Sequence, residues 1–211
     1  GDFAFAFCSF LKSIVIPRTV TKIGEFAFSD CASLEEVILQ EGLCTIGEAA
    51  FDHCSSLKKI EVPGSVKHVD LSIFDGCNSL KELDFNEGLE TLEGVFLHKF
   101  RFIKKIALPN SLENIDGQSF SGFVHLKEIR LSPDNPHFKY IDGVLYSIDL
   151  KRLVKVLPFK KGSFSVPVSV REVDRMAFQD CKNLTEIVFL DGVTTIGCNA
   201  FERCSSLKEV R

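Results

Sequence analysis

The chain has 211 residues and a 45% hydrophobic, 26% charged composition, which is enough apolar material for one domain with a continuous core. Its formal net charge is −4 and it has no run of like charge, which argues against a nucleic-acid-binding protein. No apolar stretch approaches the roughly 20 residues that a membrane-spanning helix needs.

Phenylalanine, with 20 copies against 2 Tyr and no Trp, recurs every 23 residues. The shared segment is Ala-Phe-x-x-Cys-x-x-Leu-x-x-Ile, and one step of 58 residues interrupts the constant spacing. The aromatic column contains Phe5, Phe28, Phe51, Phe74, Leu97, Phe120, Phe178 and Phe201. The column that ends the segment contains Ile14, Val37, Ile60, Leu83, Ile106, Ile129, Ile187 and Val210. Such a period predicts a solenoid, in which each coil buries its apolar side chains only by stacking on its neighbours.

Each coil is predicted to contain a strand, a bend, a second short extended piece and a short helical turn. In Leu57–Pro63 the apolar residues alternate with charged ones, as in a half-buried strand, and a proline ends the segment. Equivalent strands should stack as a parallel sheet on one face. The segment Gly-x-x-Ala-Phe-x-x-Cys favours a short helix or 3₁₀ turn on the other. The predicted fold class is therefore an α/β solenoid of 23-residue coils.

The residue before the last apolar column alternates in charge from coil to coil. It is Ser13, Glu36, Lys59, Glu82, Lys105 and Glu128. In a parallel sheet these side chains are neighbours, and each opposite pair is worth about 0.2–1 kcal/mol. The alternation supports the register, although chance use of two common charged residues is an alternative explanation.

The sequence divides into about six coils over residues 1–131, an insertion over 132–166 and about two coils over 167–211, all in one continuous domain. The strands predicted in the insertion are Phe138–Ile141, Val144–Tyr146 and Leu153–Leu157. Two interpretations of the insertion stay open. Its hairpins either extend the sheet and let the solenoid change curvature, or they form an interaction surface with Tyr140 and Tyr146.

The cysteines fall into two groups. Six share a column in which Phe100 and Phe123 substitute, so these thiols are expected to be buried and inert: Cys8, Cys31, Cys54, Cys77, Cys181 and Cys204. Cys44 and Cys198 lie in mostly polar columns and are expected to be exposed, reactive thiols. They belong to distant coils, so no intrachain disulfide is predicted.

The sequence lacks the motifs of the common enzyme classes. P-loop, G-x-G-x-x-G and G-x-S-x-G patterns are missing, as is the C-x-x-C spacing of zinc or redox sites. His53 abuts Cys54, but the two belong to columns that should point in different directions. We predict no catalytic residue, no metal site, no cofactor and no enzymatic activity.

The outward strand face is the predicted binding surface. Eight coils would give it a length of roughly 35–40 Å, enough for a protein or an extended peptide. Its candidate contact residues are Val15, Ile38, Glu61, Asp84, Ala107, Arg130, Val188 and Arg211. These residues favour a protein-binding module. The alternative is a structural segment that associates with itself through solenoid ends that carry no polar cap.

The unit Ile16–Leu34 resembles the Treponema pallidum-type, or BspA-like, leucine-rich repeat. The resemblance covers residues 1–131 and 167–211, and the insertion, with Asn135–Phe138 and Ile141–Ser147, also resembles one seen in that family. It implies a bacterial surface or secreted protein, because several family members are adhesins for host matrix or other bacteria. The expected partner is then a host-matrix or bacterial surface protein, and the expected location is extracellular or at the cell surface, with the periplasm as an alternative.

Overall fold

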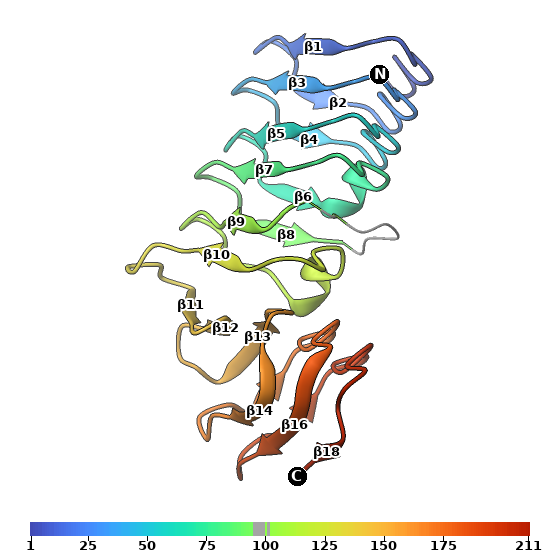
Figure 1. Cartoon of the computed structure of the whole chain (residues 1–211). Helices are drawn as coiled ribbons and strands as arrows, with labels where there is room; N and C mark the ends of the chain where they lie inside the picture. Colours follow the sequence, from blue (N-terminus) through green and yellow to red (C-terminus); the bar gives the residue numbers. More distant parts are fainter. Residues whose placement is uncertain (95–99, 101) are drawn as a thin grey trace.

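The computed structural model describes residues 1–94, 100 and 102–211. The chain winds into coils stacked along one axis, with the two termini at opposite ends of the stack (Figure 1). Each regular coil contributes a long strand to one side and a short strand to another. The predicted solenoid is therefore confirmed.

The long strands of the first six coils run parallel, with partners 23 residues apart: Ile14 pairs with Val37, and Ile60 with Leu83. These strands are β1 (Ser13–Ile16), β3 (Glu36–Leu39), β5 (Lys59–Val62), β7 (Glu82–Phe85), β9 (Lys105–Ala107) and β10 (Glu128–Arg130). They form two sheets, β1-β3-β5-β7 and β9-β10, and we call the outward side of all six strands the strand face. The short strands are β2 (Lys22–Ile23), β4 (Thr45–Ile46), β6 (His68–Asp70), β8 (Thr91–Glu93), β15 (Glu172–Val173) and β17 (Thr195–Ile196).

The phenylalanine column forms a stack of rings inside the solenoid. Phe28, Phe51 and Phe74 are at most 2% exposed. Successive ring centroids in this set lie 5.4 and 5.8 Å apart, with planes within 16° of parallel. Stacked rings of this kind add about 0.5–1.5 kcal/mol per pair beyond the burial of their surface. Leu97, the exception in the column, lies outside the described residues.

The helical turn predicted around each phenylalanine is present in only part of the described chain. It forms as the 3₁₀ helices η1 (Leu71–Phe74) and η2 (Gly117–Phe120), where the carboxylates of Asp70 and Asp116 accept hydrogen bonds from backbone N–H groups of the first turn. In other coils the residues two places before and after the phenylalanine, such as Phe26 and Asp30, adopt positive φ. The turn opens because some of its N–H groups donate to the next coil, as Phe28 N–H does to the Ala50 carbonyl at 2.8 Å, while others, such as Ser29 N–H to the Phe26 carbonyl, stay within the coil.

The loops after the long strands alternate with a period of two coils. The Glu41 carboxylate accepts hydrogen bonds from the backbone N–H groups of Gly64 and Ser65, and the Ser65 hydroxyl accepts one from the N–H of Gly42. The same contacts recur 46 residues later. The Glu87 carboxylate accepts hydrogen bonds from the backbone N–H groups of Asn110 and Ser111, and the Ser111 hydroxyl accepts one from the N–H of Gly88. Gly42 and Gly88 have φ of 107° and 118°, which favours glycine. The structural repeat is thus a pair of coils.

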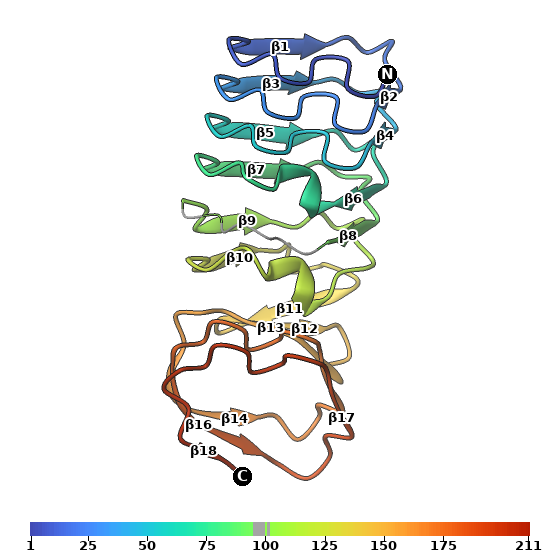
Figure 2. The same ribbon diagram turned by 90° about the vertical axis from the view of Figure 1, so that its right-hand side faces the viewer.

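The insertion forms a two-sided wall across the solenoid. It contains three strands, β11 (Phe138–Ile141), β12 (Val144–Ser147) and β13 (Arg152–Val156). β12 pairs antiparallel with both β11 and β13, and β13 pairs parallel with β15. Figure 2 shows them between the coil of β10 and the C-terminal coils. Leu145 and Val154 belong to the N-terminal core, whereas Tyr146 and Leu153 belong to the C-terminal core. The wall therefore closes one hydrophobic core and opens the next.

A long strand that the sequence did not predict follows the wall. It is β14 (Lys161–Val166), which pairs in parallel with β16 (Asn183–Phe189), and β16 in turn pairs with β18 (Glu209–Val210). These three strands form a sheet of their own, separate from the pair β9 and β10. The insertion thus supplies the long strand of a coil and interrupts the strand face.

Two arginines tie the wall and the C-terminal coils to the sixth coil. Arg152 on β13 forms a two-pronged ion pair with Asp174, at 2.7 and 2.8 Å, and also donates to the Ile115 carbonyl. Arg175 pairs with Asp116 at 2.9 Å. The two parts of the solenoid are therefore joined by directional polar contacts as well as by apolar packing.

Candidate protein-binding surface

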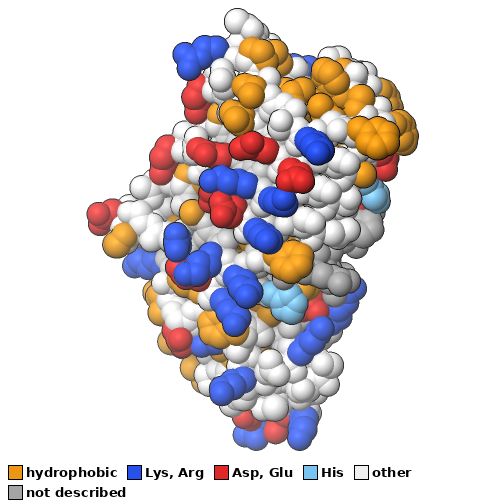
Figure 3. Space-filling model, turned by 45° about the horizontal axis from the view of Figure 1, so that its top comes forward, with side chains coloured by type: hydrophobic (Ala, Val, Ile, Leu, Met, Phe, Trp, Pro, Cys, Tyr) orange, Lys and Arg blue, Asp and Glu red, His pale blue; other side chains and the backbone are white. Residues whose placement is uncertain are grey.

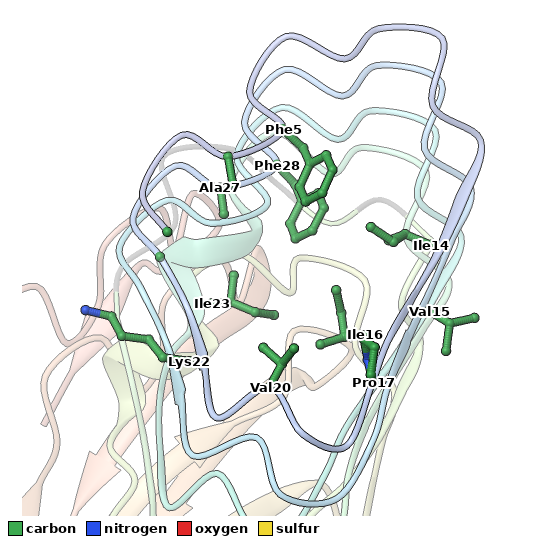
Figure 4. A pocket seen from close by; sticks show the side chains of 13 residues that line it. Phe5, Ile14, Val15, Ile16, Pro17, Val20, Lys22, Ile23, Ala27 and Phe28 are labelled. Atoms are coloured by element: carbon green, nitrogen blue, oxygen red, sulfur yellow. The ribbon is translucent and has the colours of Figure 1, made fainter.

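The outward column of candidate residues occupies the strand face over the first six coils. Val15 lies beside Ile38, Glu61 beside Asp84, and Ala107 beside Arg130. Val15 and Ile38 are 52% and 44% exposed. Figure 4 shows Val15 directed away from the coil interior, whereas Ile14 and Ile16 point into it. The column is apolar at its amino end and charged further along.

Two candidates lie apart from this column. Val188 is half-buried on β16, beside Ser165 of β14, and Arg211 is exposed next to Glu209 and Glu186. Both belong to the sheet beyond the wall. The expectation of one surface extending over eight coils is therefore wrong, because the long-strand sheet does not continue from β10 to β14.

The alternating charges form cross-strand ion pairs. Lys59 contacts Glu82 at 3.3 Å, and Lys105 contacts Glu128 at 2.7 Å. Hydrogen bonds from Lys105 and Arg130 hold the pKa of the Glu128 carboxyl below its usual value. The outward charges of this column neutralise one another, so the column stabilises the register and leaves little net charge for a ligand.

The column one place earlier begins with Lys12 and Glu35 and then carries lysine in four consecutive coils, which the sequence reasoning missed. Its members Lys58, Lys81, Lys104 and Lys127 are exposed in four consecutive coils, and we call them the lysine ladder. Figure 3 shows lysine and arginine side chains in a band down the middle of the molecule, with hydrophobic side chains gathered towards its upper end. The 23-residue period alone would have identified this column.

The tyrosines of the insertion are not the exposed rings that an interaction surface needs. Tyr146 is only 6% exposed, and burial raises its pKa to about 12. Tyr140 is half-buried against the N-terminal core, and burial raises its pKa. The expectation that Tyr146 contributes to a binding surface is wrong, because the strand that carries it packs on both sides.

The structure places Cys44 and Cys198 at the surface. In the column of six, Cys31, Cys54, Cys77 and Cys181 are buried, whereas Cys8 is exposed and Cys204 half-buried, because both belong to end coils. The buried slot is not merely apolar. The thiol of Cys54 donates to the Phe28 carbonyl at 3.1 Å, and Cys77 does the same to Phe51 at 3.2 Å. Burial raises the pKa of Cys54 to about 12, so this thiol stays protonated.

His53 and Cys54 have different partners. The His53 imidazole contacts the Asp52 carboxylate at 2.9 Å, and this hydrogen bond raises the pKa of the histidine. Among the residues that the structure describes, no three His, Cys, Asp or Glu side chains are grouped so that they could hold a metal ion.

An apolar cavity of about 330 Å³ lies at the first coil. Figure 4 shows its lining: Phe5 stacked on Phe28, with Ile14, Ile16, Val20 and Ile23 directed inwards. Every one of these residues belongs to a column that is covered by the next coil elsewhere in the solenoid. The cavity therefore has the shape and chemistry of a coil-stacking surface.

Several solved structures share this architecture. The pneumococcal vaccine antigen PcpA is 27% identical with a TM-score of 0.80, over 94% of this chain and 50% of its own. A leucine-rich cell surface protein from Faecalibacterium prausnitzii is 26% identical with a TM-score of 0.74, over 100% of this chain and 63% of its own. A leucine-rich repeat protein of T. pallidum, at 22% identity and a TM-score of 0.57, covers 93% of this chain and 78% of its own and shares the fold. This chain thus spans about half of the pneumococcal antigen.

No curated protein matches the sequence. None of the helices in the described part of the chain has the length and apolarity to span a membrane. The family model of the BspA type leucine-rich repeat region matches residues 1–127, 93–145 and 159–211. It leaves out one span, residues 146–158, which contains the end of β12 and all of β13. With its repeats matched at both ends and its coils confirmed, the chain belongs to the BspA-type leucine-rich repeat family.

Proposed function

We propose that this chain is a non-enzymatic protein-binding module of a bacterial surface or secreted protein, and that it mediates adhesion to a host-matrix protein or to a protein of another bacterium. The similar structures support this location, because they include a vaccine antigen and a cell surface protein. The periplasm is the alternative location.

The observation that carries the proposal is the exposed column on the strand face. Val15 and Ile38 are held on paired strands, so they present apolar surface without loss of backbone entropy on binding. The acidic residues Glu61 and Asp84 follow directly along the same face. An apolar anchor with a charged flank is the usual arrangement of a protein-protein contact surface.

A double variant, Ile38→Ser with Asp84→Ser, tests this surface. We expect its affinity for the protein partner to fall at least about tenfold, with an unchanged midpoint of urea unfolding, since loss of an anchor residue costs more than about 1 kcal/mol. The partner is first identified by measuring binding of the intact chain to a panel of purified host-matrix proteins and to whole bacterial cells. Ile196→Ser with Glu113→Ser, an exposed apolar and acidic pair away from the strand face, is the control. Equal binding by the two double variants would reject the strand face as the contact surface.

A second candidate function is self-association, favoured by the open cavity and by exposed rings of the first coil. Phe7 and Phe10 are 73% and 91% exposed, and Phe5 is 42% exposed beside the cavity. A second copy could stack on this surface as one coil stacks on the next. Sedimentation at tens of micromolar distinguishes the two ideas: a monomer that binds the partner supports the binding module, whereas a concentration-dependent polymer that Phe5→Ser abolishes supports self-association.

A further inference from the structure

Each lysine of the ladder directly precedes a long strand and is next to a residue of the ion-paired column, yet the two columns differ in charge pattern. In the paired column Glu and Lys alternate, so each step between coils is attractive. In the ladder every step from Lys58 to Lys127 brings like charges together. Lys58 contacts Glu35, but Lys81, Lys104 and Lys127 form no ion pair with any residue that the structure describes.

The ladder members are fixed at the spacing of the strands. The Lys81 N–H donates to the Lys58 carbonyl at 2.9 Å, and the Lys127 N–H to the Lys104 carbonyl at 2.8 Å. Strands lie about 4.7–4.9 Å apart, so the four lysines span about 14 Å along the solenoid axis. Like charges that are directly opposite in a sheet destabilise it. The repulsion between neighbouring lysines opposes folding, although the adjacent column shows that the same register can hold complementary charges.

Aromatic rings replace small side chains beside the unpaired lysines. Two places before the ladder, the column reads Ser33, Ser56 and Ser79 in earlier coils, then Phe102 and His125. Phe102 is 52% exposed, and the Lys81 ammonium lies 6.0 Å from its ring centroid. An exposed phenyl ring next to a row of ammonium groups offers an apolar face and positive charge to one ligand.

We propose that the lysine ladder, together with Phe102, binds a linear acidic polysaccharide that carries carboxylate or sulfate groups along its length. The positive strip is one side chain wide, because the charges of the paired column beside it neutralise one another, so it fits a single thin chain better than a broad polyanion such as duplex nucleic acid. The phenyl ring packs against the apolar C–H face of a sugar. This binding is independent of the protein partner proposed above.

The spacing favours a polysaccharide over an acidic peptide. Side chains on one face of an extended peptide recur about every 6.6 Å, whereas the ladder repeats about every 4.8 Å, so the two fall out of step within a few residues. A linear sugar chain is not tied to this two-residue period, because rotation about its glycosidic bonds can turn the anionic groups of neighbouring sugars towards the lysines.

The test uses the intact chain and size-defined heparin oligosaccharides, with binding followed by calorimetry at several salt concentrations. The triple variant Lys81→Gln, Lys104→Gln, Lys127→Gln should bind at least tenfold more weakly and should lower the slope of log Kd against log salt by about two to three. Lys22→Gln, Lys139→Gln, Lys161→Gln removes the same charge from exposed positions elsewhere and is the matched control. Phe102→Ser, which restores the serine of earlier coils, should weaken binding severalfold and leave the salt slope unchanged.

Three results would overturn the proposal. Wild-type affinity in the ladder variant, or equal weakening in the control, would show that the ladder is not the site. The same holds if poly-glutamate, or a single-stranded oligonucleotide of equal charge, binds as tightly as heparin and Phe102→Ser has no effect. The site would then be a peptide site or a general polyanion surface. Equal binding of alginate and heparin by the wild type would keep the proposal and assign carboxylate as the sufficient group.

Discussion

Lys155 provides a direct energetic test of the wall. Its side chain is only 2% exposed, and its ammonium donates to the Met176 carbonyl at 2.8 Å and to the Gln179 carbonyl at 3.4 Å. Burial lowers the pKa of Lys155 to about 8, although the charge of nearby Asp180 acts in the other direction. The amine is thus held between the wall and the first C-terminal coil.

The sign of the pH dependence follows from this lowered pKa. The unfolded chain keeps a lysine pKa near 10.4, so between pH 8 and 10 it binds more protons than the folded chain. Raising the pH through this window therefore stabilises the folded state. For a folded pKa of about 8, the linkage relation gives a gain of about 1 kcal/mol between pH 8 and pH 9 and about 3 kcal/mol in total. The buried thiols act oppositely, because their raised pKa values let the unfolded chain lose protons first.

The variant Lys155→Met separates the two effects. It keeps the length of the side chain and all the thiols but removes the titration, at a pH-independent loss of about 1–3 kcal/mol for the unpaired carbonyls. Urea unfolding of wild type and variant at pH 7, 8 and 9, in reductant, should show the difference in free energy moving by about 1 kcal/mol in favour of the wild type from pH 8 to pH 9. Lys161→Met, at an exposed position, should give a constant difference. Parallel curves for Lys155→Met would show that this amine is not desolvated.

Three further predictions concern the coils themselves. Phe51→Ala should lower the free energy of unfolding by about 3–5 kcal/mol, whereas Phe10→Ala, at a ring 91% exposed, should change it by less than about 0.5 kcal/mol in the same urea titration. In a native thiol titration the exposed cysteines Cys8, Cys44 and Cys198 should react promptly, and the buried ones only on unfolding; five or more prompt thiols would contradict the packing. Gly47→Ala should lower the melting temperature more than Gly162→Ala, because its new Cβ would lie 2.6 Å from the Glu25 nitrogen whereas Gly162 has open space around it and only an unfavourable φ of 77°.

The coils could be predicted from the sequence because each core position of a regular coil packs against the equivalent position of the coils above and below. Cys54 repeats Cys31 because each thiol donates to a phenylalanine carbonyl 26 residues earlier. The sequence does not show which backbone carbonyl lies beside each thiol, so it predicts only that the cysteine column is apolar. The opened turns were also missed, since apolar spacing of three and four does not tell whether an N–H group donates within its own coil or to the next.

The wall could be predicted as strands but not as a partition. Leu153 and Val154 are consecutive apolar residues, which indicates a strand buried on both sides. Which core receives each side chain depends on coils more than twenty residues away in both directions. The prediction that the two tyrosines are exposed failed for Tyr146, because an aromatic ring with a polar end is equally suited to the boundary of two cores.

The wall also determines how long a ligand can be in contact with one continuous surface. Because the wall follows β10, the strand face ends at Arg130, five coils from Val15 or roughly 24 Å at the usual strand spacing. The lysine ladder ends in the same coil, at Lys127, and beyond the wall its equivalent position in β16 is Thr185. A partner that binds beyond this length must cross a change in sheet and in charge. The proposed contact residues Val15 to Arg130 therefore lie in the first six coils, whereas the C-terminal coils pack against the wall that follows them.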